Sequence, residues 1–127
     1  MQLFGGGGRS TSVADVPDNI KKMIEYYKKI ATGSVNLTKD IKNGDIIFPV
    51  SLNFKPSIFI VKIKVEHLYA NISYNLNSKD IDQKYLVETD GATAVMNVTF
   101  RNNSGVISIS NSTYYEKYIV TDWIAIE

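Results

Sequence analysis

The stretch that decides the fold is Tyr118-Ile119-Val120-Thr121-Asp122-Trp123-Ile124-Ala125-Ile126. Its β-branched and aromatic side chains alternate with a period of two, which is typical of a β-strand. Apolar residues stand on both sides of the alternation, so the sequence predicts a strand in the middle of a sheet covered on both faces. The single tryptophan, Trp123, is expected in the core.

The region before this strand predicts further strands of the same kind, at residues 33–38, 45–52, 57–66, 69–76, 84–88, 93–101 and 106–111. Asn, Asp, Gly and Pro fill the breaks between them, and Gly105 is expected to supply a positive φ in a hairpin turn. Many short strands joined by such turns predict an antiparallel β-sandwich. The expected core comprises Ile46, Phe48, Val50, Phe59, Val61, Ile63, Val65, Ile72, Tyr74, Val95, Phe100, Ile107, Ile109, Trp123 and Ala125.

Residues 15–32 predict an amphipathic helix, with Asp15 as its N-cap and Gly33 as its C-terminal stop. Its apolar positions step by four, three, four and three residues, which is a coiled-coil spacing. A helix of this length is marginal in water by itself. It therefore packs either on its own β-domain or on copies of itself. The residues of this seam are Val16, Ile20, Met23, Tyr27 and Ile30.

Four consecutive glycines, Gly5 to Gly8, follow Leu3 and Phe4 near the start of the sequence. Glycine has the highest ordering entropy, so this segment forms no regular element by itself. It is either a disordered terminus or an attachment arm in which Leu3 and Phe4 dock into a neighbouring subunit. The predicted domain organisation is an arm at 1–14, a helix at 15–33 and a β-sandwich at 34–127.

Composition excludes several classes of function. The net charge is +1 and no basic patch is present, which argues against a nucleic-acid partner. No cysteine is available for a disulfide or a thiolate metal site. No apolar run reaches the roughly 18 residues of a membrane helix, and no signal-peptide pattern is found, so the expected protein is soluble with no membrane partner.

Few residues suggest chemistry. His67 is the only histidine and is expected at a surface turn. Asp80 and Asp82 lie in a polar loop that lacks the order of a calcium loop, and it is either a solvated turn or a weak cation-binding or sugar-binding loop. No nucleophile motif, phosphate loop or metal-ligand spacing is present. The sequence therefore predicts no enzyme, no cofactor and no metal.

A second surface feature is the Ser/Asn-rich segment that contains Tyr114 and Tyr115. Paired tyrosines provide flat apolar faces with polar tips, which suit sugar rings or protein contacts. Further candidates for the same surface are Tyr69, Asn71, Tyr85 and Arg101. The alternative is that one tyrosine packs on the core while the other is merely exposed.

The Trp123-Ile124-Ala125-Ile126 ending resembles the C-terminal β-domains of small phage tail and particle-surface proteins. So does the turn Leu52-Asn53-Phe54-Lys55-Pro56 with the apolar run that follows it, residues 57–65. Such domains are similar to the H-type lectin sandwich, and the resemblance covers roughly residues 34–127. It implies a homotrimer whose loops bind cell-surface glycans. The frequent Ile, Asn, Lys and Tyr fit an AT-rich bacterial or phage genome.

The expected function is that of a non-enzymatic, trimeric fibre or decoration subunit of a phage or phage-tail-like particle. It would be made in the bacterial cytoplasm and displayed on the virion, with a lectin-like head for a host cell-surface glycan. The alternative is a purely structural capsid-decoration, neck or baseplate component that binds only other virion proteins.

Overall fold

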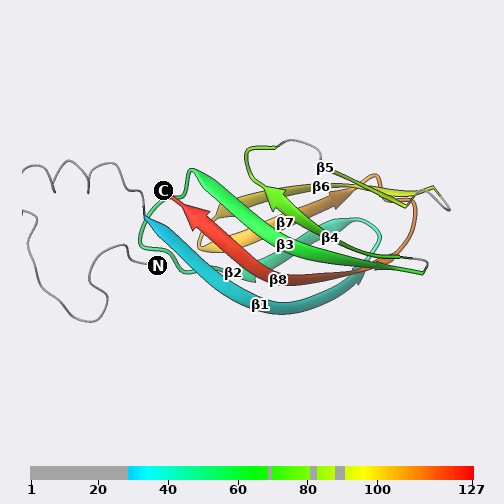
Figure 1. The fold of residues 1–127 in the computed structure, drawn as a ribbon, viewed down its shortest axis with the longest axis horizontal. Helices are drawn as coiled ribbons and strands as arrows, with labels where there is room; N and C mark the ends of the chain where they lie inside the picture. Colours follow the sequence, from blue (N-terminus) through cyan, green and yellow to red (C-terminus); the bar gives the residue numbers. More distant parts are fainter. Residues whose placement is uncertain (1–28, 69, 81–82, 88–90) are drawn as a thin grey trace, which may run out of the picture.

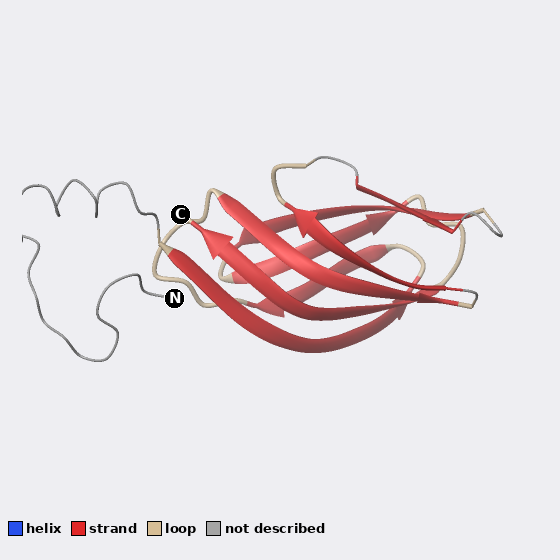
Figure 2. Cartoon of the chain, viewed as in Figure 1, coloured by secondary structure: helices blue, strands red, loops and turns tan. Residues whose placement is uncertain are grey.

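The computed structural model describes residues 29–68, 70–80, 83–87 and 91–127 as two four-stranded antiparallel sheets packed face to face (Figures 1 and 2). One sheet has the order β1-β8-β3-β4 and the other the order β2-β7-β6-β5. The strands are β1 (Ile30–Ile41), β2 (Gly44–Pro49), β3 (Ile58–His67), β4 (Ala70–Asn77), β5 (Gln83–Val87), β6 (Ala92–Arg101), β7 (Ser104–Ser110) and β8 (Glu116–Ile126). The predicted mainly β sandwich is confirmed, and each predicted strand has its counterpart.

The predicted central strand is β8, which pairs with β1 on one side and β3 on the other. Its central position is confirmed, but the expectation of a cover on both faces is wrong for the described residues. Asp122 is exposed, and Ile124 on the same outward side keeps 39% of its surface. The apolar residues of that side therefore lie on an outer sheet face.

A register shift interrupts the alternation of β8. Lys62 of β3 pairs with Asp122 and Ile63 pairs with Val120, so the register skips Thr121. Before the shift Tyr118 and Val120 face the core, and after it Trp123 and Ala125 do. A β-bulge of this kind inserts one extra residue into the strand. The core-facing residues after the bulge therefore have odd numbers, whereas those before it have even numbers. The bulge lets residues of both parities share one core.

The N-terminal end of β1 corrects the predicted helix boundary. Residues 30–33 are strand, because Ile30 to Gly33 pair with Ile126 to Trp123 and complete the ladder on the free side of β8. Gly33 is therefore no helix stop. A Cβ on it would lie 2.5 Å from the Trp123 indole, so its lack of a side chain gives the ring room to pack over β1.

The β6–β7 hairpin turns through Asn102 and Asn103, whose φ angles are 51° and 53°. Two successive left-handed residues are the geometry of a type I′ turn, which asparagine tolerates. The prediction that Gly105 supplies the positive φ is wrong. Gly105 is needed because a Cβ there would overlap the ring of Phe48.

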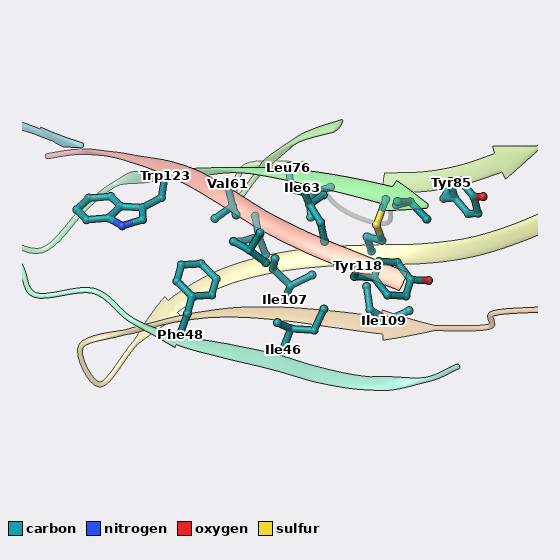
Figure 3. Packing of buried hydrophobic residues seen from close by; sticks show 14 of the residues in the cluster. Ile46, Phe48, Val61, Ile63, Leu76, Tyr85, Ile107, Ile109, Tyr118 and Trp123 are labelled. Carbon is teal, nitrogen blue, oxygen red and sulfur yellow. The ribbon is translucent and has the colours of Figure 1, made fainter. Parts of the chain in front are cut away.

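The core lies between the two sheets, with Trp123 and Phe48 toward one end and Tyr118 and Tyr85 toward the other (Figure 3). Most predicted core residues are buried, and Ile72, Tyr74 and Phe100 pack against the core while partly exposed. The prediction of Val95 as a core residue is wrong, since the inward residues of β6 are Ala92, Ala94, Met96 and Val98. Core residues that the sequence did not predict are Leu76, Tyr85, Ala92, Ala94, Met96, Val98, Val106, Tyr118 and Val120.

The arm at 1–14 and the helix up to residue 28 lie outside the described residues, as do Leu3, Phe4, Val16, Ile20, Met23 and Tyr27. Only Ile30 of the predicted seam is described, and it belongs to β1. In the part of the chain that is described, no helix is long and apolar enough to cross a membrane.

Candidate functional site

The sandwich has two distinct ends. At one end β1 and β3 begin and β8 finishes, because Ile126 pairs with both Ile30 and Ile58. At the other end lie the turn at Leu68 between β3 and β4 and the loop 111–115 that leads into β8 (Figure 1). We call this second end the tip. The 11 residues of β8 separate the two ends, a span of roughly 33 Å at about 3.3 Å per residue.

The tip carries three of the large apolar side chains that are most exposed in the described structure. Leu68 keeps 83% of its surface, Tyr115 75% and Tyr114 50%. Scattered exposed apolar residues are normal on a soluble protein, but a group of them at one place marks a candidate binding surface. Phenol rings add a flat apolar face with a hydroxyl at its edge.

Hydrogen bonds hold the tyrosine-bearing loop 111–115 in place. The Ser112 N–H donates to Asn43 Oδ1 at 3.0 Å, and the Ser112 hydroxyl donates to the Tyr114 carbonyl at 2.7 Å. The Thr113 N–H donates to the Thr93 carbonyl at 3.0 Å, while the Thr93 N–H donates to Thr113 Oγ1 at 2.9 Å. These contacts fix the loop backbone to the turn between β1 and β2 and to β6, and they pre-order Tyr114 before any ligand binds.

Beneath the loop lies a buried polar cluster, which we define as His67, Tyr85 and Glu116. His67 Nδ1 and Glu116 Oε2 are 2.5 Å apart, and each side chain is only 5% exposed. The Tyr85 hydroxyl donates to the same Glu116 oxygen at 2.9 Å. Glu116 begins β8 in one sheet, whereas Tyr85 belongs to β5 in the other. The carboxylate therefore joins the two sheets at the tip.

Aromatic rings connect this cluster to the surface. The His67 ring lies 6.1 Å from the Tyr114 ring and 6.4 Å from the Tyr85 ring, measured between centroids. Tyr85 in turn makes an edge-on contact with Tyr74 at 5.9 Å. The half-exposed Tyr114 thus rests on a histidine that is itself fixed by a buried carboxylate.

Two phenols near the cluster are held in their neutral form. Burial raises the pKa of Tyr85, and its hydrogen bond to Glu116 and the charge of that carboxyl group act in the same direction. Burial also raises the pKa of Tyr118, with Glu116 adding to the effect and Ser112 opposing it. The Tyr118 hydroxyl has no hydrogen-bond partner among the described residues, since the Ser112 hydroxyl donates to the Tyr114 carbonyl instead.

The structure does not gather all the predicted site residues. Tyr114 and Tyr115 lie at the tip, but Arg101 ends β6 at the opposite end of the sandwich, beside the turn at Asn102. Asp80 lies in the connection after β4, where the Ser78 N–H donates to the Phe59 carbonyl at the start of β3. Asp82 lies outside the described residues. The acidic loop and Arg101 are thus separated from the tyrosine pair.

His67 is no exposed turn residue, which corrects the sequence prediction. The alternation along β3 indicates this burial, and the prediction missed it. Every second residue faces the core, namely Phe59, Val61, Ile63 and Val65, and His67 is the next residue on that side. Glu116 likewise continues the inward parity of Tyr118 and Val120. A histidine and a glutamate at the same end of one core are natural partners, because buried polar groups require hydrogen bonds.

Comparison with family models, curated proteins and solved structures finds no match to this chain. Within the described ranges, no three His, Cys, Asp or Glu side chains gather as metal ligands would. The arrangement at the tip is an ordered, apolar and hydroxyl-bearing surface above the buried contact between His67 and Glu116. Since the Glu116 carboxylate is covered, it can support that surface but is poorly placed to meet a substrate.

Proposed function

We propose that this chain is a non-enzymatic projecting subunit of a phage or phage-tail-like particle, with its tip directed outward. The proposal rests on one observation: the start of β1 and the tip lie at opposite ends of the sandwich. The chain enters β1 at Ile30, whereas the exposed Leu68, Tyr114 and Tyr115 lie at the far end of the sandwich. A subunit held by the segment before Ile30 would therefore present its tyrosines away from the particle.

The ligand proposed for the tip is a glycan of the host cell surface. Sugar rings stack on the apolar faces of tyrosines and bond to their hydroxyls, and Tyr114 and Tyr115 offer both. The hydrogen bonds of Ser112 and Thr113 fix this loop in advance, which lowers the entropic cost of binding. The assignment to a virion and the homotrimeric state rest on the sequence resemblance to phage β-domains.

A pull-down tests the proposal, with purified protein, bacterial host envelopes on one side and particles that lack the subunit on the other. Binding to envelopes that free sugars compete away is the expected result. Binding to particles alone would overturn the glycan-binding head and favour a decoration, neck or baseplate subunit that contacts only virion proteins. Release of reducing sugar from the envelopes would contradict the non-enzymatic role.

A further inference from the structure

The buried contact under the tip joins the only histidine of the sequence to a carboxyl group. His67 Nδ1 lies 2.5 Å from Glu116 Oε2, and two lone pairs would repel each other at that distance, so a proton lies between these atoms. The Tyr85 hydroxyl, which burial keeps neutral, donates to the same oxygen at 2.9 Å. With this proton shared, the next proton that the pair takes up in mild acid goes to the second imidazole nitrogen, Nε2.

Two tyrosine rings contact this imidazole. The His67 centroid lies 6.4 Å from that of Tyr85, at an interplanar angle of 60°, and 6.1 Å from that of Tyr114, at 49°. An aromatic ring attracts a cation that lies within about 6 Å of its centroid. Uptake of the second proton therefore turns both neutral contacts into attractive ones. Tyr85 is buried and bonded to Glu116, so the half-exposed Tyr114 is the ring that can respond.

We propose that the protonation state of His67 regulates the tip by setting how firmly the Tyr114 ring is held. This inference rests on the proposed function, because the regulated property is ligand binding at the tip. Above an imidazolium the Tyr114 ring is held in one position, and a ring that is already ordered binds a ligand at a lower entropic cost. Above a neutral imidazole it loses that attraction. The tip therefore binds its glycan more tightly in mild acid than in mild alkali.

The surrounding ionisable groups leave this range of pH to the imidazole. The other phenols around the pair are those of Tyr74, Tyr114, Tyr115 and Tyr118. The charged groups of the neighbouring strands lie on the outer sides of the sheets, at Asp40, Lys64, Glu66, Lys84 and Lys117. Carboxylates and ammonium groups in water keep their charges between about pH 5 and pH 8, and phenols stay neutral there. Among the described residues around the tip, His67 is thus the one expected to change charge.

The expected size of the effect follows from the contact between the imidazolium and the ring. A cation–π contact near the surface changes an equilibrium constant by about two- to five-fold. The negative charge of Glu116 also faces the imidazole and offsets part of the attraction, so about five-fold is an upper limit. Binding at the tip should be about two- to five-fold tighter at about pH 5 than at about pH 8.

NMR of the free, full-length chain tests the regulation without any ligand, since a single histidine gives a single imidazole titration. We expect the Tyr114 ring signals to shift with the same midpoint as the His67 signals. Tyr114→Leu should lower that midpoint by roughly half a pH unit, because the ring no longer favours the imidazolium. The matched control is Tyr115→Leu, a change at the neighbouring, 75% exposed tyrosine, which should leave the midpoint unchanged.

Binding of the chain to host envelopes at about pH 5 and about pH 8 tests the consequence for the tip. The glutamine of His67→Gln can donate to Glu116 but takes up no proton, so this variant should bind equally at both pH values. The wild type measured beside it should show the two- to five-fold difference. Circular dichroism checks the fold of each variant, and the NMR comparison of the two leucine variants does not depend on His67→Gln.

An imidazole that does not titrate between about pH 5 and pH 8 would overturn the inference. So would a Tyr114 ring that is unaffected by the titration, or envelope binding by the wild type that is equal at both pH values. Absence of envelope binding at either pH would count against the proposed function instead. In that case the titration of the free chain would still decide whether His67 controls Tyr114.

Discussion

Replacement of Glu116 by leucine should destabilise the sandwich far more than the same change at Glu66. The two glutamates lie near each other at the start of β8 and the end of β3, since Glu66 pairs with Lys117 across the ladder. Glu116 is 5% exposed and binds both His67 and Tyr85. Glu66 is 33% exposed and lies 3.4 Å from Lys64 and 3.8 Å from Lys117.

The magnitudes follow from that difference in burial. Removal of Glu116 takes the buried acceptor from both His67 and Tyr85, and each such loss costs about 1–3 kcal/mol, whereas exposed ion pairs contribute about 0–1 kcal/mol. A domain of this size loses about 4–8 °C in Tm for each 1 kcal/mol. We therefore expect Glu116→Leu to lower Tm by at least ~8 °C and Glu66→Leu by only a few degrees.

Thermal and urea unfolding measure the stability of both variants. The triple change His67→Leu, Tyr85→Phe and Glu116→Leu should recover much of the loss, because it removes the orphaned polar groups together with the carboxylate. Equal losses for Glu116→Leu and Glu66→Leu would refute the reasoning. So would a triple variant that is less stable than Glu116→Leu alone.

Three further outcomes are expected from the packing and the buried phenols. Gly33→Ala should cost about 1–3 kcal/mol by overpacking against Trp123, with Ser34→Ala near neutral in urea unfolding. Trp123→Ala should cost about 3–5 kcal/mol, and a near-silent change would contradict its core position. The pKa values of Tyr85 and Tyr118 are raised in the folded state, so the stabilisation that comes from these neutral phenols is complete below about pH 10 and is lost above it. The free energy of unfolding should then fall by up to about 1.4 kcal/mol per pH unit for each phenol. Tyr85→Phe should reduce this alkaline slope in urea unfolding.

The strands were predictable because their alternation is a local property of the sequence. Phe59, Val61, Ile63 and Val65 define the inward face of β3 without any knowledge of the partner strands. The shift in β8 was not predictable by the same reasoning, since a bulge changes parity within one strand. Tyr118 and Trp123 have opposite parities and still share the core.

Tertiary contacts explain the remaining errors. Ile30 continues a helical spacing in the sequence, but the free side of β8 pairs with it and makes it a strand residue. Gly33 and Gly105 were interpreted through backbone freedom, whereas the rings of Trp123 and Phe48 account for them. Such contacts join residues far apart in the chain, so local propensity carries no record of them.

The candidate site was predictable only in part for the same reason. The tyrosine pair at 114 and 115 could be identified from its polar, aromatic loop, and it does lie on the surface. Its support could not be identified, because His67 and Glu116 are 49 residues apart. Parity along β3 would have placed His67 inward, but parity along β8 counted from Trp123 would have placed Glu116 outward, because the sequence does not show the bulge between them.

The measurement that tests the central claim most directly is binding to host envelopes by two double variants. Tyr114→Ala/Tyr115→Ala removes the rings of the tip, and Asp80→Ala/Arg101→Ala alters the candidate residues that lie away from it. The account predicts that the tyrosine variant loses envelope binding while remaining folded, and that the other binds like the wild type. Retained binding by the tyrosine variant, with loss in Asp80→Ala/Arg101→Ala, would contradict an outward-facing tip.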